Sequence, residues 1–255
     1  MSERWLWTQK EDIGPSPRWG HAMAYEDARQ RVVLFGGWGG VVVGALGDTW
    51  EWNGSTWTQI ADMGPPGCYR SSMTYDVSRQ CAVLFGGLAL RGQWELVGDT
   101  WEWNGTEWTQ IADTGPSKRQ RPTMVFDRSR ECLVLFGGFS GNLPLLGDTW
   151  EWDNDAGWVK RQDMGPRDIY YPTMASTGEH TILFGTQGGA ATGQTWEWDG
   201  RLWTQRQGMG PPGRYAHDLE YDSQRDRVVL FGGELAVSAG KALLGDTWEL
   251  AIIEQ

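Results

Sequence analysis

Leu34-Phe35-Gly36-Gly37, followed by Gly47-Asp48-Thr49-Trp50-Glu51-Trp52, is the stretch that decides the fold, because both strings return along the chain. The first string begins again at Leu84, Leu135 and Leu230, with the variant Leu-Phe-Gly-Thr at Leu183. The second begins again at Gly98 and Gly147, with variants at Gly193 and Gly245. A third string, Trp-Thr-Gln, starts at Trp7, Trp57, Trp108 and Trp203, and Trp158-Val-Lys replaces it once. The copies lie about 50 residues apart, so five copies of one unit fill the chain.

Each unit predicts four short strands. In the first copy, residues 18–25 alternate in polarity, 31–35 form an apolar run, and 49–52 and 56–60 are rich in aromatic and β-branched residues. Asn53-Gly54, between the last two segments, is a strong signal for a tight hairpin. Glycine, asparagine and proline separate the segments and no helical periodicity occurs, so the sequence predicts an all-β fold.

A four-stranded unit with an apolar run ending in Gly-Gly, followed at a distance by aromatic residues, resembles the kelch repeat of β-propellers. The resemblance covers all 255 residues. It implies one propeller domain, 1–255, with four antiparallel strands per blade, and the five repeats give five blades, fewer than the six or seven usual in the family. We expect blades at about 18–60, 68–112, 119–162, 169–207 and 214–250, with residues 4–10 completing the last. The chain begins with a fourth-strand pattern and ends after a third-strand pattern, so its N-terminal strand should close the ring.

Composition and charge exclude several classes of protein. With 36 Gly, 18 Trp and 40% hydrophobic residues, the chain is neither disordered nor collagen-like. The net charge of −11 disfavours nucleic acid and anionic membranes as partners. No apolar run is long enough to span a bilayer, and no signal peptide is evident at Met1. Three cysteines without metal-ligand spacing fit a reducing compartment, so we expect a cytoplasmic protein without a metal or cofactor.

Repetition explains most tryptophans without a functional role. Fourteen of the 18 lie in third or fourth strands and should pack between blades. Four lie elsewhere, namely Trp5, Trp19, Trp38 and Trp94.

The first strand of each propeller blade lines the central channel, and its side chains alternate. We expect one parity to face the blade interior and the other to face the channel. The interior set is Met23, Met73, Met124, Met174 and Leu219. The channel set is Arg18, Gly20, Ala22, Ala24; Cys68, Arg70, Ser72, Thr74; Arg119, Arg121, Thr123, Val125; Ile169, Tyr171, Thr173, Ala175; and Arg214, Ala216, Asp218, Glu220.

Acids break the channel pattern in blade five alone. Asp218 and Glu220 replace small residues, and Arg70 and Arg121 should face them across the axis. One interpretation is an active site, with Asp218, Glu220 and Tyr171 as catalytic residues and Arg70 and Arg121 as anion holders. The other is a structural plug, in which opposed arginines and acids neutralise each other.

The loops between second and third strands are the longest and least alike, at 38–46, 88–97, 139–146, 186–192 and 234–244. They open at the channel end that carries Arg18, Arg119 and Arg214, which we expect to contact a ligand with Trp38, Trp94 and Phe139. These loops are unusually apolar. They either rim a binding funnel or pack on one another.

Three functions remain open, because fold does not determine function. The first is a stand-alone module, presumed monomeric, that binds a small molecule or peptide in the funnel. The second is a metal-free isomerase, lyase or hydrolase acting on a partly apolar anionic molecule. The third is a lectin, in which exposed tryptophans stack on sugars.

Overall fold

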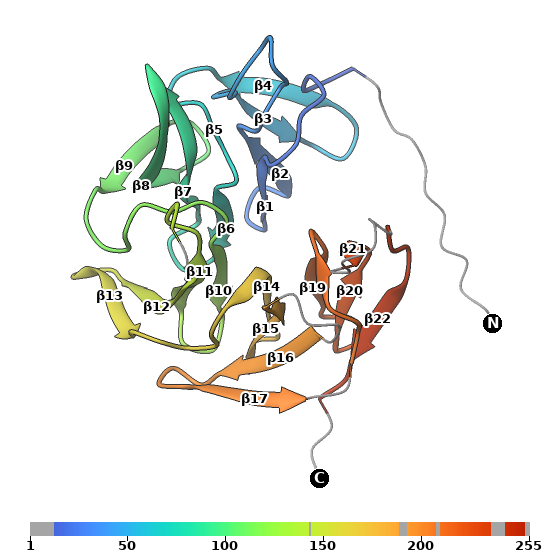
Figure 1. Ribbon diagram of the computed structural model, residues 1–255. Helices are drawn as coiled ribbons and strands as arrows, with labels where there is room; N and C mark the ends of the chain where they lie inside the picture. Colours follow the sequence, from blue (N-terminus) through green and yellow to red (C-terminus); the bar gives the residue numbers. More distant parts are fainter. Residues whose placement is uncertain (1–12, 143, 189–192, 208–209, 236–242, 253–255) are drawn as a thin grey trace, which may run out of the picture.

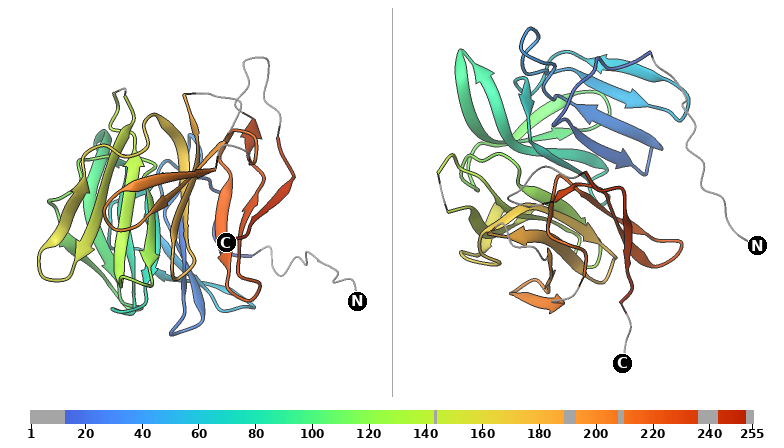
Figure 2. Two further views of the ribbon diagram at one scale, coloured as in Figure 1. Left: turned by 90° about the horizontal axis from the view of Figure 1, so that it is seen from below. Right: turned by 45° about the vertical axis from the view of Figure 1, so that its right-hand side comes forward.

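Strands are the only regular elements in the residues that the computed structural model describes, which are 13–142, 144–188, 193–207, 210–235 and 243–252. They form small antiparallel sheets around a central axis, as the five blades of a β-propeller (Figure 1). Seen from other sides, the blades stand next to one another around the axis (Figure 2). The predicted fold class is confirmed. This part of the chain holds no helix that could cross a lipid bilayer.

Blades one to three follow the predicted strand order. Blade one contains β1 (Ala22–Glu26), β2 (Arg31–Phe35), β3 (Thr49–Trp52) and β4 (Trp57–Ala61). Blade two contains β5 (Cys68–Tyr69), β6 (Ser72–Asp76), β7 (Cys81–Arg91), β8 (Gln93–Trp103) and β9 (Trp108–Ala112), and both β5 and β6 pair with β7. Blade three contains β10 (Thr123–Asp127), β11 (Cys132–Gly138), β12 (Leu146–Asp153) and β13 (Gly157–Gln162).

Blades four and five differ in how complete they are. Blade four contains β14 (Ile169–Ser176), β15 (Thr181–Gln187), β16 (Gly193–Trp198) and β17 (Trp203–Gln207). Blade five contains β19 (Asp218–Asp222), β20 (Arg227–Phe231) and β22 (Thr247–Leu250), beside a separate pair of β18 (Arg214–Tyr215) and β21 (Glu234–Leu235). Its expected outer strand, residues 4–10, lies outside the described residues.

The segment 88–97, predicted as a loop, is a two-stranded ribbon. β7 and β8 continue beyond the blade, with Leu88 opposite Leu96 and Leu90 opposite Trp94. Cross-strand pairs of this kind stabilise a ribbon that single-sequence patterns do not reveal. The ribbon extends beyond the blade body, as the teal and green strands β7 and β8 of Figure 1 show.

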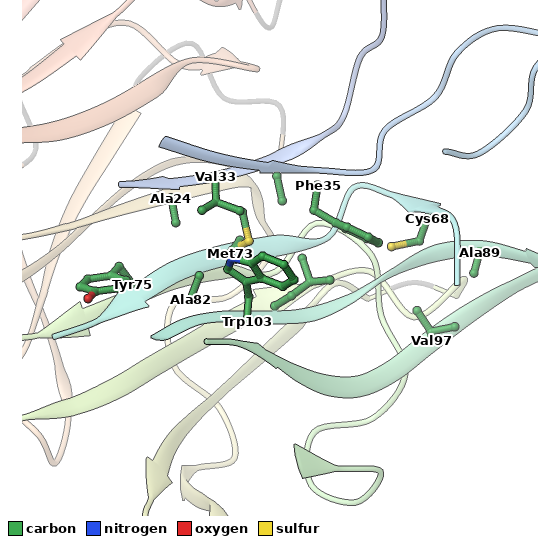
Figure 3. Packing of buried hydrophobic residues seen from close by; sticks show 12 residues of the cluster. Ala24, Val33, Phe35, Cys68, Met73, Tyr75, Ala82, Ala89, Val97 and Trp103 are labelled. Carbon is green, nitrogen blue, oxygen red and sulfur yellow. The ribbon is translucent and has the colours of Figure 1, made fainter. Parts of the chain in front are cut away.

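The hydrophobic core is divided among the interfaces between neighbouring blades. Ala22 and Ala24 are buried against blade two, in the same cluster as Met73 and Trp103. Figure 3 shows Met73 and Trp103 of blade two beside Val33 of blade one. The prediction that Ala22 and Ala24 face the channel is therefore wrong. Where two propeller sheets stack face to face, the first strand turns one side-chain face to the neighbouring blade, and its edge meets the axis. Val125 and Ala175 are displaced from the channel in the same way.

A tryptophan at the start of an outer strand joins each blade to the preceding one. The indole Nε1 donates to the threonine of the Gly-Asp-Thr string in the preceding blade, in the pairs Trp108–Thr49 (2.8 Å), Trp158–Thr100 (2.7 Å) and Trp203–Thr149 (2.8 Å). The ring also meets the edge of a phenylalanine of that blade, namely Phe35, Phe85 or Phe136. These three tryptophans thus pack between blades as predicted. At the interface between blades five and one, Phe231 is 56% exposed within the described residues.

Ion pairs hold the aspartate of the second repeated string, Gly-Asp-Thr, in place in three blades. Each links an arginine at the start of a blade to the aspartate of the Gly-Asp-Thr string, in the pairs Arg18–Asp48, Arg119–Asp148 and Arg214–Asp246. Burial disfavours the Asp148 carboxylate, but hydrogen bonds from Arg119 outweigh this and lower the pKa of Asp148. The aspartates also accept hydrogen bonds from Trp50, Trp150 and Trp248. They are therefore partners of arginine and tryptophan, and not simply turn residues.

We expect Arg119→Met to lower the free energy of unfolding by about 3–5 kcal/mol, because it leaves a carboxylate buried without its cation. Arg128, which pairs with Asp27 at an exposed position, is the matched control. Arg128→Met should cost less than about 1 kcal/mol. Urea denaturation of both variants measures the difference, and equal losses would contradict the structural role of the buried pair.

Candidate functional site

In every blade, one residue near the start of the strand closest to the axis has a backbone conformation outside the ordinary strand region. The backbone there is left-handed, with φ between +48° and +65°, at Gly20, Arg70, Arg121, Tyr171 and Ala216. Such a conformation is costly for a residue with a Cβ. The amide of Arg70 donates to the carbonyl of Gly20, and that of Arg121 to the carbonyl of Arg70, each at 2.7 Å. The repeat therefore builds a hydrogen-bonded ring segment whose side chains are not needed for blade packing.

Three of these positions line a cavity of about 370 Å³ over blades two to four. Its polar wall comes from Arg70, Gln120, Arg121 and Tyr171. The apolar wall is formed by Phe139, Leu145, Ile169, Tyr170 and Pro172. Of the predicted site residues, the fold thus brings together Arg70, Arg121, Tyr171 and Phe139. The size falls within the usual range for small-molecule sites.

Each cavity arginine is held in place by neutral groups. Arg70 donates from Nη1 to Gln120 Oε1 at 2.8 Å, and its guanidinium lies 5.0 Å from the ring centre of Tyr69. Arg121 donates from Nη1 to the hydroxyl of Tyr171, and its guanidinium lies 4.3 Å from that ring. Cation–π contacts and amide acceptors orient a guanidinium without neutralising it.

Neither Arg70 nor Arg121 forms an ion pair with any described residue, in contrast to Arg18, Arg119 and Arg214. Arg70 Nε is also buried without a hydrogen-bond partner among the described residues. Burial, and then the nearby charge of Arg121, lower the pKa of Arg70. Two like charges at a partly buried wall create a strong preference for an anion.

The predicted tryptophans lie beside the cavity, on blades one and two. Trp38 stacks against Trp94 at 5.2 Å and against Tyr69 at 5.6 Å, between ring centres. Trp94 remains 43% exposed. The loops are therefore partly self-packed and partly exposed. The rings of Trp38 and Trp94 pack on one another, whereas Val41 and Val42 are almost fully exposed. Leu143, Val237 and the loop segments 189–192 and 236–242 lie outside the described residues.

Arg18, Arg119 and Arg214, predicted as ligand-binding residues, are committed to their aspartates instead. Arg119 and Arg214 are completely buried, and each also donates to a backbone carbonyl of its own blade. The carboxylate and nearby oxygen acceptors take all five donors of Arg119 and four of the five of Arg214, and burial keeps both from solvent. This placement corrects their predicted role to a structural one.

Asp218 and Glu220 do not meet the arginines. Both side chains are exposed, neither lines the 370 Å³ cavity, and no ion pair joins them to Arg70 or Arg121 in the described part of the chain. Although Glu220 reaches solvent, partial desolvation of its carboxyl group raises its pKa, and the nearby charge of Asp218 raises it further. The structural plug proposed for these four residues is therefore not formed.

Gln120 and Tyr170 belong to the cavity but were not predicted. They stand at the repeat position just before the left-handed residue, where the other blades have Trp19, Tyr69 and Tyr215. Gln120 is the one non-aromatic residue at that position, so the same search for broken repeats would have found it.

A larger open depression of about 610 Å³ lies at the outer edge of blades three and four. Its arginine Arg130 is already committed to ion pairs with Asp127 and Glu151. Equivalent networks recur in other blades, for example Arg79 with Asp76 and Glu102. The depression is therefore part of the repeat. The described residues hold no cluster of histidine, cysteine or acidic side chains able to bind a metal.

Comparisons with known proteins address the fold only. No protein-family model matches the chain, and no curated protein matches it. Among solved structures, the one described as "Structure of YjhT" is similar, with a TM-score of 0.73 and 13% sequence identity. The similarity covers 92% of this chain and 82% of the other. At that identity it supports the β-propeller fold and says nothing about the site.

His217 of blade five packs against blade four. It is 6% exposed, and its Nε2 lies 2.8 Å from Thr173 Oγ1. Burial, with a smaller contribution from Arg214, lowers the pKa of His217 to about 4. The histidine therefore has a packing role between blades four and five.

Stability should therefore fall as the pH drops from about 6.5 to 4, because the unfolded chain binds a proton at His217 that the folded chain refuses. His217→Gln should remove this contribution, which amounts to about 3 kcal/mol over the full interval. Urea denaturation at several pH values, with the variant subtracted from the parent, isolates it from the carboxylates. If the free energy of unfolding depended on pH in the same way in parent and variant, His217 would not be buried as a neutral imidazole.

Proposed function

We propose that this chain is a kelch-type propeller that binds a small anionic molecule with a flat apolar body. The observation that carries the proposal is the pair of unneutralised guanidiniums, Arg70 and Arg121, on the wall of the 370 Å³ cavity. The protein carries a net charge of −11, yet no carboxylate of the described residues pairs with either group. A ligand carboxylate or phosphate would supply the missing charge.

The binding mode follows from the two walls of the cavity. The free N–H groups of Arg121 and Arg70 would donate to the anion, while Gln120 and Tyr171 keep both guanidiniums in place. Phe139 and the other apolar residues would cover the rest of the ligand. Charge-assisted hydrogen bonds in such a partly dry site contribute about 1.5–3 kcal/mol each.

Binding is favoured over the two alternatives. The acids needed for acid/base catalysis, Asp218 and Glu220, lie outside the cavity. A lectin would need an open ring to stack on a sugar, yet Trp38 packs against both Tyr69 and Trp94. A volume of about 370 Å³ fits a small molecule better than a peptide segment.

A panel of aromatic carboxylates and phosphates, each with its neutral amide or alcohol, tests the proposal by isothermal titration calorimetry. At least one anion should bind, and its neutral counterpart should bind at least tenfold more weakly. Arg121→Gln and Arg70→Gln should each weaken binding by about 10- to 100-fold. Arg201→Gln, at an exposed turn, is the matched control and should leave the affinity unchanged.

Anions that bind equally well to Arg121→Gln would show that the cavity is not the site. Equal affinity for an anion and its neutral counterpart would show that charge is not what the protein recognises.

A further inference from the structure

Gln120 interrupts a series of aromatic side chains around the axis. The residue just before the left-handed one is Trp19, Tyr69, Tyr170 or Tyr215 in the other four blades. Rings of neighbouring blades meet edge to face, with 5.1 Å between the ring centres of Trp19 and Tyr69 and 6.1 Å between those of Tyr170 and Tyr215. Gln120 of blade three therefore leaves the series without a ring between Tyr69 and Tyr170.

The backbone does not require a glutamine at this position. Gln120 forms the same antiparallel pair of backbone hydrogen bonds with Phe139 that Trp19 forms with Trp38 in blade one. The 370 Å³ cavity opens at the blade that lacks the ring, and Gln120 and Tyr170 are both among its lining residues. A mostly apolar cavity at a place where the repeat lacks an aromatic side chain is suited to an aromatic ring from a ligand.

The contact with Arg70 determines which way the Gln120 amide points. A guanidinium can only donate, so the atom that faces Arg70 Nη1 at 2.8 Å must be the oxygen, Oε1. Nε2 then points away from Arg70, and no hydrogen bond joins it to any described residue. It is also not one of the buried side-chain atoms without a partner, so it reaches open space. Because Gln120 lines the cavity, Nε2 is a free donor on the cavity wall.

The polar side chains of this wall present mainly donors to a ligand. Arg70 and Arg121 have no acceptor atom, and the two side-chain acceptors, Gln120 Oε1 and Tyr171 Oη, each already accept from an arginine. Gln120 contacts Arg70 and precedes Arg121 in the chain, so its amide lies beside the proposed anion position. A lone pair next to the ligand's anionic group would be satisfied here, whereas an N–H group would face another donor.

We propose that the site takes a heteroaromatic carboxylate, whose ring occupies the place of the missing aromatic side chain and whose ring nitrogen accepts a hydrogen bond from Gln120 Nε2. Arg70 and Arg121 hold the carboxylate, so this inference rests on the anion binding proposed above. Phe139 and Tyr170 supply apolar surface for the ring. Gln120 is then the residue that determines which aromatic anion is preferred.

Quinoline-2-carboxylate and 2-naphthoate are the matched probes, because they differ only in having a ring nitrogen or a C–H group beside the carboxylate. Isothermal titration calorimetry on the parent protein should show quinoline-2-carboxylate binding about five- to tenfold more tightly. Indole-2-carboxylate, which places an N–H donor there, should bind more weakly than 2-naphthoate. Equal affinities for the two matched probes would overturn the proposal and leave anion binding intact.

Two variants assign the discrimination to one side chain. Gln120→Met keeps the approximate length of the side chain and removes the amide, so the ratio of the two affinities should fall to about one. Arg121→Gln should weaken both probes by the same factor and keep the ratio, because Arg121 meets only the carboxylate. If Gln120 were merely structural, Gln120→Met would change both affinities together and preserve the ratio, and that result would overturn the proposal.

Failure of this inference can be told from failure of the anion site. Aliphatic carboxylates or phosphates that bind the parent and lose affinity in Arg121→Gln, when neither matched probe binds, would leave the anion site standing and exclude a heteroaromatic ligand. If no anion of any kind bound to the parent, both proposals would be wrong.

Discussion

The hydrogen bond from an outer-strand tryptophan to a threonine of the preceding blade is the interaction on which the propeller depends. A single blade cannot bury its own faces, because its sheet is stacked between two neighbours. Trp108, Trp158 and Trp203 each complete an interface that belongs to the blade before their own. Folding one blade therefore stabilises the next. This dependence explains why the Gly-Asp-Thr string, the Leu-Phe string and the Trp-Thr-Gln string recur together.

The repeated strings were sufficient to predict the all-β fold and its five blades, because repetition fixes both strand type and spacing. Residue-level geometry was predicted less well. Simple alternation assigned Ala22 to the channel, but the left-handed residue at Gly20 interrupts the alternation, and stacking of the sheets turns Ala22 to the neighbouring blade. The pairing of Arg119 with Asp148 joins residues that are remote in sequence, and no local pattern records it. The β7–β8 ribbon likewise depends on cross-strand contacts.

Positions that break the repeat remain the best sequence guide to the candidate site, although not all of them contribute. The ring of left-handed residues is a backbone requirement that leaves its side chains free to vary. Blade one has glycine there, whereas blades two and three have Arg70 and Arg121. Placing two cations side by side opposes stability and is not needed by the fold, which is a common property of functional groups. Asp218 also breaks the repeat, but its strand points it away from the cavity lining.

The central claim is that packing explains the repeated residues, and that the charged exceptions at the axis bind an anion. A crystal structure of the protein soaked in 4-bromobenzoate tests it most directly, because the bromine can be located by its anomalous signal. The account predicts a carboxylate within hydrogen-bond distance of Arg70 and Arg121, with the bromine against Phe139. A bromine signal only at the exposed loops, or at the surface arginines of the outer turns, would contradict it.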